Sequence, residues 1–270
     1  MKLSMNRSLP SQSFAPCNRG AGADADASKV EGVSGNVRRV FWEIVGAMEP
    51  SILRGVPASE VLKFMSALEA DKSAYVPIPK EDLAHFNAAY FRRNLLKFLI
   101  VLDRFGARLT PKPFIDIGGG TGAAGAAWHR MAQIDGADLQ ASVHFDRSEV
   151  QLAAGRAAYS ALVSRSDLPQ FKSHLDVAPF GDASSICLFS FCICELMAEG
   201  EHPKDILKMV GSELIAVDFR ESLLAFTAGL GGALNPILFV HEEYDLSSDL
   251  ADALGQRRLK VSGLYAKRIS

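Results

Sequence analysis

One short stretch constrains the fold of this 270-residue chain more than any other. An apolar segment, Phe114–Ile117, holds a single acidic residue, Asp116, and runs into four glycines among residues 118–122. A segment of small residues follows, from Ala123 to about Ala132. Sharp strand-to-helix turns need backbone conformations that glycine adopts at low cost, and they leave main-chain N–H groups open to a ligand. The stretch therefore predicts a parallel α/β sheet with a cofactor-binding loop at the carboxyl end of one strand.

Two classes of cofactor fit this loop. Gly120-x-Gly122-x-x-Gly125 matches the dinucleotide pattern GxGxxG, which is a weak signal by itself. Asp116 to Gly122 also matches the pattern of an acidic residue, one residue and Gly-x-Gly-x-Gly. In this respect the chain resembles class I S-adenosylmethionine-dependent methyltransferases. A buried carboxylate needs compensation, which the cationic methionyl end of that cofactor would supply and a pyrophosphate would not. A structural Asp116, bonded to nearby backbone, is the remaining interpretation.

The resemblance implies further contacts with S-adenosylmethionine, which would leave as S-adenosylhomocysteine. A second predicted strand, Leu139 to Asp146, ends in an acid that would bind the ribose hydroxyls in either cofactor class. A third, about Phe171 to Val177, carries Asp176, which would contact the adenine amino group, although a turn residue is as good an interpretation. The expected cofactor-binding residues are Asp116, Gly118, Gly119, Gly120, Gly122, Asp146, Arg147, Asp176 and Ser190.

Later segments complete the predicted sheet. Ser185–Cys194 is almost continuously apolar, as expected for a central strand buried on both faces. Three more strands are predicted at residues 213–218, 237–240 and about 257–269. This count and order resemble the seven-stranded Rossmann-like methyltransferase sheet, with six parallel strands and one antiparallel. The Asn/Asp-Pro-Pro-aromatic motif that often follows the fourth strand in methyltransferases of nucleobase and amide nitrogens is absent.

The chain divides into three predicted regions. Residues 1–35 are polar and lack a hydrophobic period, so we expect a disordered tail. Residues 36–108 have helical periodicity and would form a lid that contacts the substrate, and residues 109–270 would form the cofactor-binding domain. Tyr90, Arg93 and Glu195 are candidate substrate-binding residues, because arginine can bind a carboxylate in two parallel bonds. A solvated helix face is the alternative for the first two, and an ordinary residue opening a helix is the alternative for Glu195.

Methyl transfer needs a general base only when the nucleophile carries a proton, since the cofactor already activates the methyl group. His241 and Glu242 follow the sixth predicted strand and are candidate bases. A surface histidine is the alternative. No metal site is predicted, because the four cysteines lack metal-binding spacing.

Composition bears on the partners. The net charge is −2 and the pI about 6.3, so nothing indicates binding to nucleic acid or to a membrane surface. Glycines and a proline interrupt the uncharged run at residues 222–240, which argues against a membrane span. We therefore expect a cytoplasmic O- or N-methyltransferase of secondary metabolism, acting on a small molecule or peptide, either monomeric or a homodimer.

Three alternatives stay open. The run from Tyr90 to Trp128 resembles ribosomal small-subunit Rsm-type methyltransferase-like proteins, although their basic charge and cysteine cluster are missing. A ribosomal-RNA or ribosome-associated factor is therefore one alternative. The second is an NAD(P)-dependent oxidoreductase on a similar sheet. The third is a non-catalytic descendant that binds the cofactor structurally.

Overall fold

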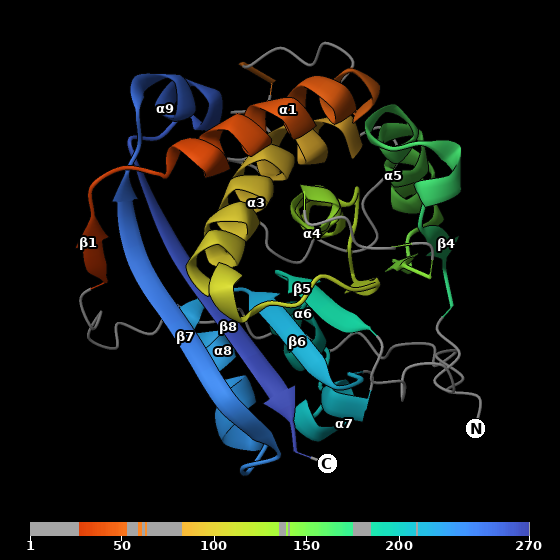
Figure 1. The fold of residues 1–270 in the computed structure, drawn as a ribbon, viewed down its shortest axis with the longest axis vertical. Helices are drawn as coiled ribbons and strands as arrows, with labels where there is room; N and C mark the ends of the chain where they lie inside the picture. Colours follow the sequence, from red (N-terminus) through yellow and green to blue (C-terminus); the bar gives the residue numbers. More distant parts are fainter. Residues whose placement is uncertain are drawn as a thin grey trace.

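A single twisted sheet organises the protein (Figure 1). The computed structural model describes residues 27–52, 59–60, 63, 83–134, 139, 141–174, 185–208 and 210–269. Within them eight strands pair in the order β1-β7-β8-β6-β5-β2-β3-β4. Only β8 runs antiparallel to its neighbours, β6 and β7. The strands are β1 (Ser28–Val30), β2 (Phe114–Ile117), β3 (Val143–Phe145), β4 (Gln170–Lys172), β5 (Ile186–Ser190), β6 (Glu213–Val217), β7 (Leu234–Asp245) and β8 (Arg258–Arg268).

The predicted α/β sheet is confirmed, with one strand more than expected. Strands β2 to β8 supply the predicted six parallel strands and one antiparallel strand. The eighth, β1, lies inside the predicted disordered tail, so that prediction is wrong for residues 28–30. β1 pairs in parallel with β7, with Ser28 opposite Glu242 (Figure 1). Such an edge strand is held by main-chain hydrogen bonds, so a polar sequence without hydrophobic alternation gives little sign of it. Residues 1–26 lie outside the described residues.

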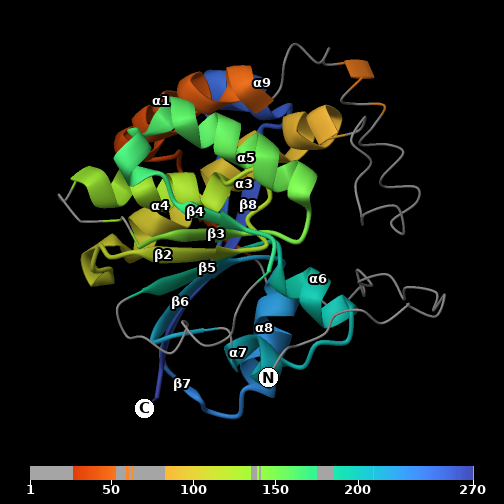
Figure 2. The same cartoon turned by 90° about the vertical axis from the view of Figure 1, so that its right-hand side faces the viewer.

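Helices cover both faces of the sheet (Figure 2). One layer contains α1 (Gly35–Ile52), α3 (Leu83–Phe105), α4 (Ala123–Ile134), α5 (Glu149–Leu162) and α9 (Ser248–Leu254). The opposite layer contains α6 (Ile193–Ala198), α7 (Pro203–Lys208) and α8 (Arg220–Gly229), and two short 3₁₀ turns, η2 (Gly106–Arg108) and η3 (Arg165–Asp167), complete the elements. Alternate residues of β5 enter the two cores, Leu188 one and Phe189 the other. This double burial explains the continuous apolar run of that strand.

The helical region predicted as a lid shares the core of the sheet. Phe41 and Ile44 of α1 and Leu95 and Leu99 of α3 are completely buried in the same cluster as Leu188. α3 packs on α4 and β8, and α1 packs on α5. These two helices therefore form part of the sheet's covering layer, since an amphipathic helix buries its apolar face against a neighbouring element. The rest of the predicted lid, residues 53–58, 61–62 and 64–82, lies outside the described residues.

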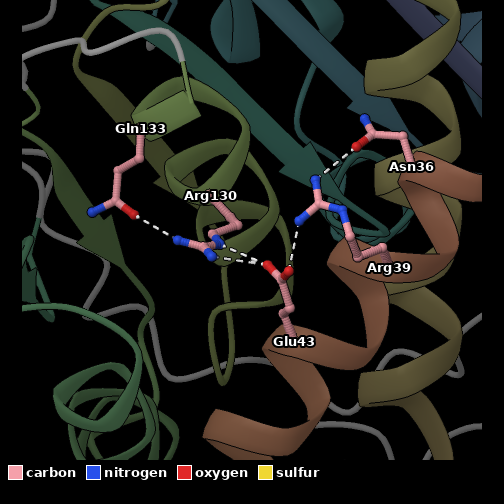
Figure 3. A network of polar contacts seen from close by, with 5 residues as sticks. All are labelled: Asn36, Arg39, Glu43, Arg130 and Gln133. Atoms are coloured by element: carbon pink, nitrogen blue, oxygen red, sulfur yellow. Dashed lines mark hydrogen bonds and ion pairs between the residues drawn. The ribbon is translucent and has the colours of Figure 1, made fainter.

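A polar network ties α1 to α4 (Figure 3). The Glu43 carboxylate accepts hydrogen bonds from Arg130 Nε at 3.0 Å and Nη2 at 2.9 Å, and from Arg39 Nη1 at 2.6 Å. Arg39 also donates to Asn36, and Arg130 to Gln133. Arg130, followed by Arg39, holds the pKa of Glu43 below its usual range despite the opposing effect of burial. The network is largely solvated, so its contribution to stability is less than about 1 kcal/mol, but it fixes the helix that begins at the glycine loop.

Candidate functional site

The glycine loop lies at the carboxyl edge of the sheet, where β2 turns into α4. Gly118, Gly120 and Gly122 all have positive φ, of 63°, 56° and 94°. At Gly120 a Cβ would meet nothing within 4 Å, so the backbone conformation alone calls for glycine there. At Gly119 the requirement is space, because a Cβ would lie 2.3 Å from Cε1 of His144. The loop is therefore tightly packed beneath and open above Gly120.

Asp116 supports this loop from inside the protein. Its side chain is completely buried, and its Oδ2 accepts a hydrogen bond of 3.0 Å from the Gly125 N–H. The same oxygen lies 3.1 Å from Nδ1 of His144, whose Nε2 lies 2.9 Å from the Gly120 carbonyl oxygen. The side chain points under the loop, toward His144, and its Oδ1 has no hydrogen-bond partner among the described residues. These contacts favour the structural interpretation of Asp116, and its contact with a cofactor stays a prediction.

His144 is the residue of this cluster that sequence reasoning missed. Burial alone lowers its pKa, but the hydrogen bond and charge of Asp116, together with the Gly120 carbonyl, outweigh burial and raise it. The rings of Tyr159 and Phe171 pack around the imidazole at centroid distances of 6.1 and 5.2 Å. His144 occupies a polar position in an alternating strand, so the sequence pattern predicts an exposed side chain and gives no sign of its buried partner. The result is a buried contact between the His144 imidazole and the Asp116 carboxylate that supports the loop from below.

Asp146 stands where the predicted ribose-binding acid should stand, at the end of β3. Its Oδ2 accepts a hydrogen bond of 2.8 Å from the Gly120 N–H, and its Oδ1 accepts one of 2.7 Å from the Ser148 N–H. Burial raises its pKa, and these two main-chain donors oppose that shift. Each carboxylate oxygen has a second lone pair for a ligand hydroxyl. Asp146 is therefore part of the loop and retains capacity to bind a ligand.

The other predicted cofactor residues differ in their surroundings. Arg147 is exposed and donates through Nη1 to Glu199 over 2.8 Å, so it links the end of β3 to the end of α6. Ser190 closes β5, and its Oγ is buried without a hydrogen-bond partner among the described residues. Asp176 lies outside the described residues. The roles of these three residues toward a cofactor stay predictions.

The turn after β5 is strained. Phe191 has a φ of 57°, the only positive value at a non-glycine among the described residues. This conformation costs about 1–2 kcal/mol for a residue with a side chain. It ends the strand at Ser190, so the prediction that the strand continues through Cys194 is wrong. The Phe191 N–H donates to the Val217 carbonyl over 2.8 Å, which holds the turn against the end of β6.

Charged and aromatic groups gather around Phe191. Nζ of Lys97, on α3, lies 4.8 Å from the centre of the Phe191 ring. The Phe219 ring, 52% exposed, meets the Phe191 ring edge-on at 5.6 Å. Asp218 is buried at the end of β6 and accepts hydrogen bonds from the N–H groups of Cys194 at 3.0 Å and Phe219 at 2.7 Å. Burial raises the pKa of Asp218, while these bonds oppose the shift.

The predicted substrate-binding residues lie on two helices that reach this edge. Tyr90 and Arg93 are on α3, with Arg93 one turn before Lys97, and Glu195 is on α6. Loss of hydration raises the pKa of the Glu195 carboxyl, and Arg147 opposes this shift. The negative charges of Asp146, Asp218 and Glu199 raise the pKa as well. The side chain nevertheless keeps contact with solvent. The structure thus brings Arg93 and Glu195 to the same edge as the glycine loop.

His241 and Glu242 lie on β7, away from the glycine loop, and their catalytic role stays a prediction. β7 is four strand spacings from β2, about 19 Å, because antiparallel β8 intervenes between β6 and β7. Nδ1 of His241 lies 2.8 Å from Ser262 Oγ on that strand. Glu242 is paired with Arg104, whose Nε donates over 2.8 Å, and with Tyr244. Burial raises the pKa of Glu242, but the hydrogen bonds from Arg104 and Tyr244 outweigh burial, so the net pKa is below its usual value. The pair with Arg104 anchors β7 to α3.

The fold and the loop together define a Rossmann-like α/β protein with the strand order of the methyltransferase-type sheet. Among the described residues, no helix has the length and apolar content to cross a bilayer. The same residues include no group of three or more histidine, cysteine, aspartate or glutamate side chains arranged to hold a metal ion.

Comparisons with known proteins find only distant likenesses. No protein-family model and no curated protein matches the chain. Similar solved structures include the magnesium protoporphyrin IX methyltransferase of Synechocystis PCC 6803 with bound S-adenosylmethionine (14% identity, TM-score 0.40, covering 67% of this chain and 84% of that one). A candidate RNA methyltransferase of Pyrococcus horikoshii (11%, 0.43, 66% and 85%) and the ribosomal protein L11 methylase of Lactobacillus delbrueckii (14%, 0.39, 66% and 80%) are also similar. Likenesses this distant do not assign a reaction or a substrate to the chain.

Proposed function

We propose that this protein is an S-adenosylmethionine-dependent methyltransferase that acts on a small molecule or a peptide at oxygen or nitrogen. The observation that carries the proposal is the position of β8, antiparallel between β6 and β7. The dinucleotide-binding sheet is mostly parallel and has the strand order 3-2-1-4-5-6, without an antiparallel strand inserted next to its last strand. Here the seven strands β2 to β8 follow the methyltransferase order, and the glycine loop follows the central strand β2.

The residues at the loop fit the adenosyl part of this cofactor. Gly120 leaves open space where a side chain would stand, so a ligand can approach the main chain there. Asp146 has acceptor capacity for the ribose hydroxyls beyond its two main-chain donors. Asp116 is buried beneath the loop, so the position of its side chain does not add support for a role as counter-ion of the methionyl ammonium. The preference for this cofactor therefore depends on the topology and on Asp146.

The cofactor, when bound, supplies a methyl group already activated by the sulfonium. The chain's own residues then have to align the acceptor and exclude water. Tyr90, Arg93 and Glu195 are the residues we propose for contact with the acceptor. Glu195 joins His241 and Glu242 as a candidate general base for a protonated nucleophile, because its raised pKa brings proton exchange closer to neutral pH.

Calorimetric titration with S-adenosylhomocysteine and with NADH tests the proposal. We expect S-adenosylhomocysteine to bind, and Asp146→Ala to weaken it by about tenfold to a hundredfold, because a charged acceptor of two hydroxyls is lost. Asp146→Asn keeps an acceptor for the main chain and should weaken binding less. Asp103→Asn, on the exposed side of α3, is the matched control and should bind as the wild type does.

The alternatives predict different outcomes in this titration and in a methylation assay. Binding of NADH without S-adenosylhomocysteine would identify a nicotinamide-dependent oxidoreductase and overturn the proposal. Binding of S-adenosylhomocysteine that is equally strong in Asp146→Ala would leave the cofactor class standing and refute the ribose contact. Cofactor binding without methylation of any small molecule, but with methylation of ribosomal RNA, would favour the ribosome-associated alternative. The cytoplasmic location and the homodimer stay predictions.

A further inference from the structure

Two cations lie close together beside the strained turn, and neither forms an ion pair with a described carboxylate. Arg93 and Lys97 are one helical turn apart on α3, a spacing at which like charges repel. Nε of Arg93 is buried and has no hydrogen-bond partner within the described part of the chain. Among the described residues, no carboxylate oxygen lies within 4 Å of a side-chain nitrogen of Arg93 or Lys97. The ring of Phe191 lies against Lys97, at 4.8 Å from Nζ, and offers only a weak attraction.

The charged groups that face Lys97 from neighbouring elements do not neutralise it. Asp218, at the end of β6, attracts Lys97 but uses its oxygens for the N–H groups of Cys194 and Phe219. Burial, followed by repulsion from Arg93, lowers the pKa of Lys97 to about 8, and Asp218 only partly opposes this. Lys97 is therefore still mostly protonated at pH 7. Folding leaves two positive charges with incomplete hydration, an arrangement that is costly unless a ligand completes it.

We propose that Arg93 and Lys97 form a carboxylate-binding site beside Phe191 at the cofactor edge of the sheet. The guanidinium would hold the carboxylate through paired N–H groups, and the ammonium would add a point charge. Phe191 and the exposed Phe219 would provide an apolar surface for the remainder of the ligand. Lys97 was not among the residues singled out from the sequence.

The carboxylate has two sources, and both rest on the proposed function. One is the methionyl carboxylate of the cofactor, and the other is an acid group on the acceptor. The chemistry of recognition is the same for both. Three probes separate them: S-adenosylhomocysteine, 5′-methylthioadenosine, which keeps the adenosine and the sulfur but lacks the amino-acid group, and benzoate.

The experiment compares the wild type with Lys97→Met and Arg93→Met, each of which removes a charge and keeps an apolar stem. Lys204→Met, at an exposed position of α7, is the control. If the cofactor supplies the carboxylate, affinity for S-adenosylhomocysteine falls about tenfold or more in both variants and affinity for methylthioadenosine does not change. If the acceptor supplies it, S-adenosylhomocysteine binds normally and the binding of benzoate, measured by NMR titration, is lost.

Unchanged affinity for both S-adenosylhomocysteine and benzoate in the two variants would overturn the site. A wild type that binds no S-adenosylhomocysteine would overturn the proposed function, and the benzoate titration, which needs no cofactor, would then decide the site by itself. In that case, benzoate binding to the wild type that is lost in both variants would support the carboxylate site. No benzoate binding to the wild type would refute the carboxylate site. A melting temperature of Lys97→Met well below that of Lys204→Met would show that Lys97 is a structural residue and would also overturn the proposal.

Discussion

The two halves of the cofactor edge are built in opposite ways. Under the loop after β2, the Asp116 carboxylate has a cation, His144, and a main-chain donor, Gly125. Beside the turn after β5, Phe191 has a positive φ and Lys97 has no described carboxylate within ion-pair distance. In the first half the buried carboxylate has partners inside the protein. The second half combines backbone strain with a partly buried cation that forms no ion pair among the described residues.

This difference separates what the protein fixes by itself from what it leaves for a ligand. A loop supported by buried contacts of this kind has its shape before any cofactor arrives, so binding requires little reorganisation. Strain and uncompensated charge persist only where the surrounding structure enforces them, and they concentrate at functional sites. The β2–β3 half therefore suits the invariant part of a reaction, the cofactor, and the β5–β6 half suits recognition of a particular substrate.

The largest effect is expected from removing Asp116. Asp116→Ala leaves the buried His144 without its counter-ion and the Gly125 N–H without its acceptor. We expect the free energy of unfolding, measured by urea denaturation, to fall by about 3–5 kcal/mol. Asp116→Asn keeps an acceptor for Gly125 and should lose less.

Asp205→Ala, which removes an exposed partner of Lys208 on α7, is the control for that experiment and should leave stability unchanged within error. If the free energy of unfolding falls no more in Asp116→Ala than in the control, the contact between Asp116 and His144 does not stabilise the loop after β2.

A smaller effect is expected from the pH dependence at Lys97. Its pKa in the folded protein is about 8, below the ordinary 10.5, so the unfolded chain binds more protons between these values. Stability of the wild type should therefore rise with pH across that window by about 1–3 kcal/mol relative to Lys97→Met. Denaturation of both proteins at pH 8 and pH 10.5 measures the difference, and a wild type that loses stability relative to the variant would contradict an uncompensated charge.

The smallest effect isolates the strain at Phe191. Phe191→Gly and Phe191→Ala both remove the ring, but only glycine relieves the positive φ. The glycine variant should be the more stable of the two by about 0.5–1 kcal/mol in urea denaturation, after the entropy cost of glycine is subtracted. At Phe239, a partly exposed residue of β7 with ordinary φ, the same pair of substitutions should give the opposite order. If the alanine variant is the more stable one at both positions, the backbone at Phe191 is not strained.

Sequence reasoning located the loop and the strands because their signals are local. The glycines of the loop, the apolar run of β5 and the acid at the end of β3 each depend on a few neighbouring residues. It did not find contacts between residues that are distant in the sequence. The contact of Asp116 with His144 joins two strands that are far apart along the chain. The distance of His241 and Glu242 from the loop depends on where β8 inserts.

The α/β sheet, the glycine loop and the acid after the next strand could all be predicted from the amino-acid sequence, since backbone conformation and hydrophobic period depend on consecutive residues. Which charged groups have partners could be seen only in the folded protein. The tertiary structure placed His144 under Asp116 and left Lys97 beside Phe191. The reason is physical: the free energy of a buried charge depends on what surrounds it in space, and residues from β2, β3, α3 and β5 become neighbours only when the sheet has formed.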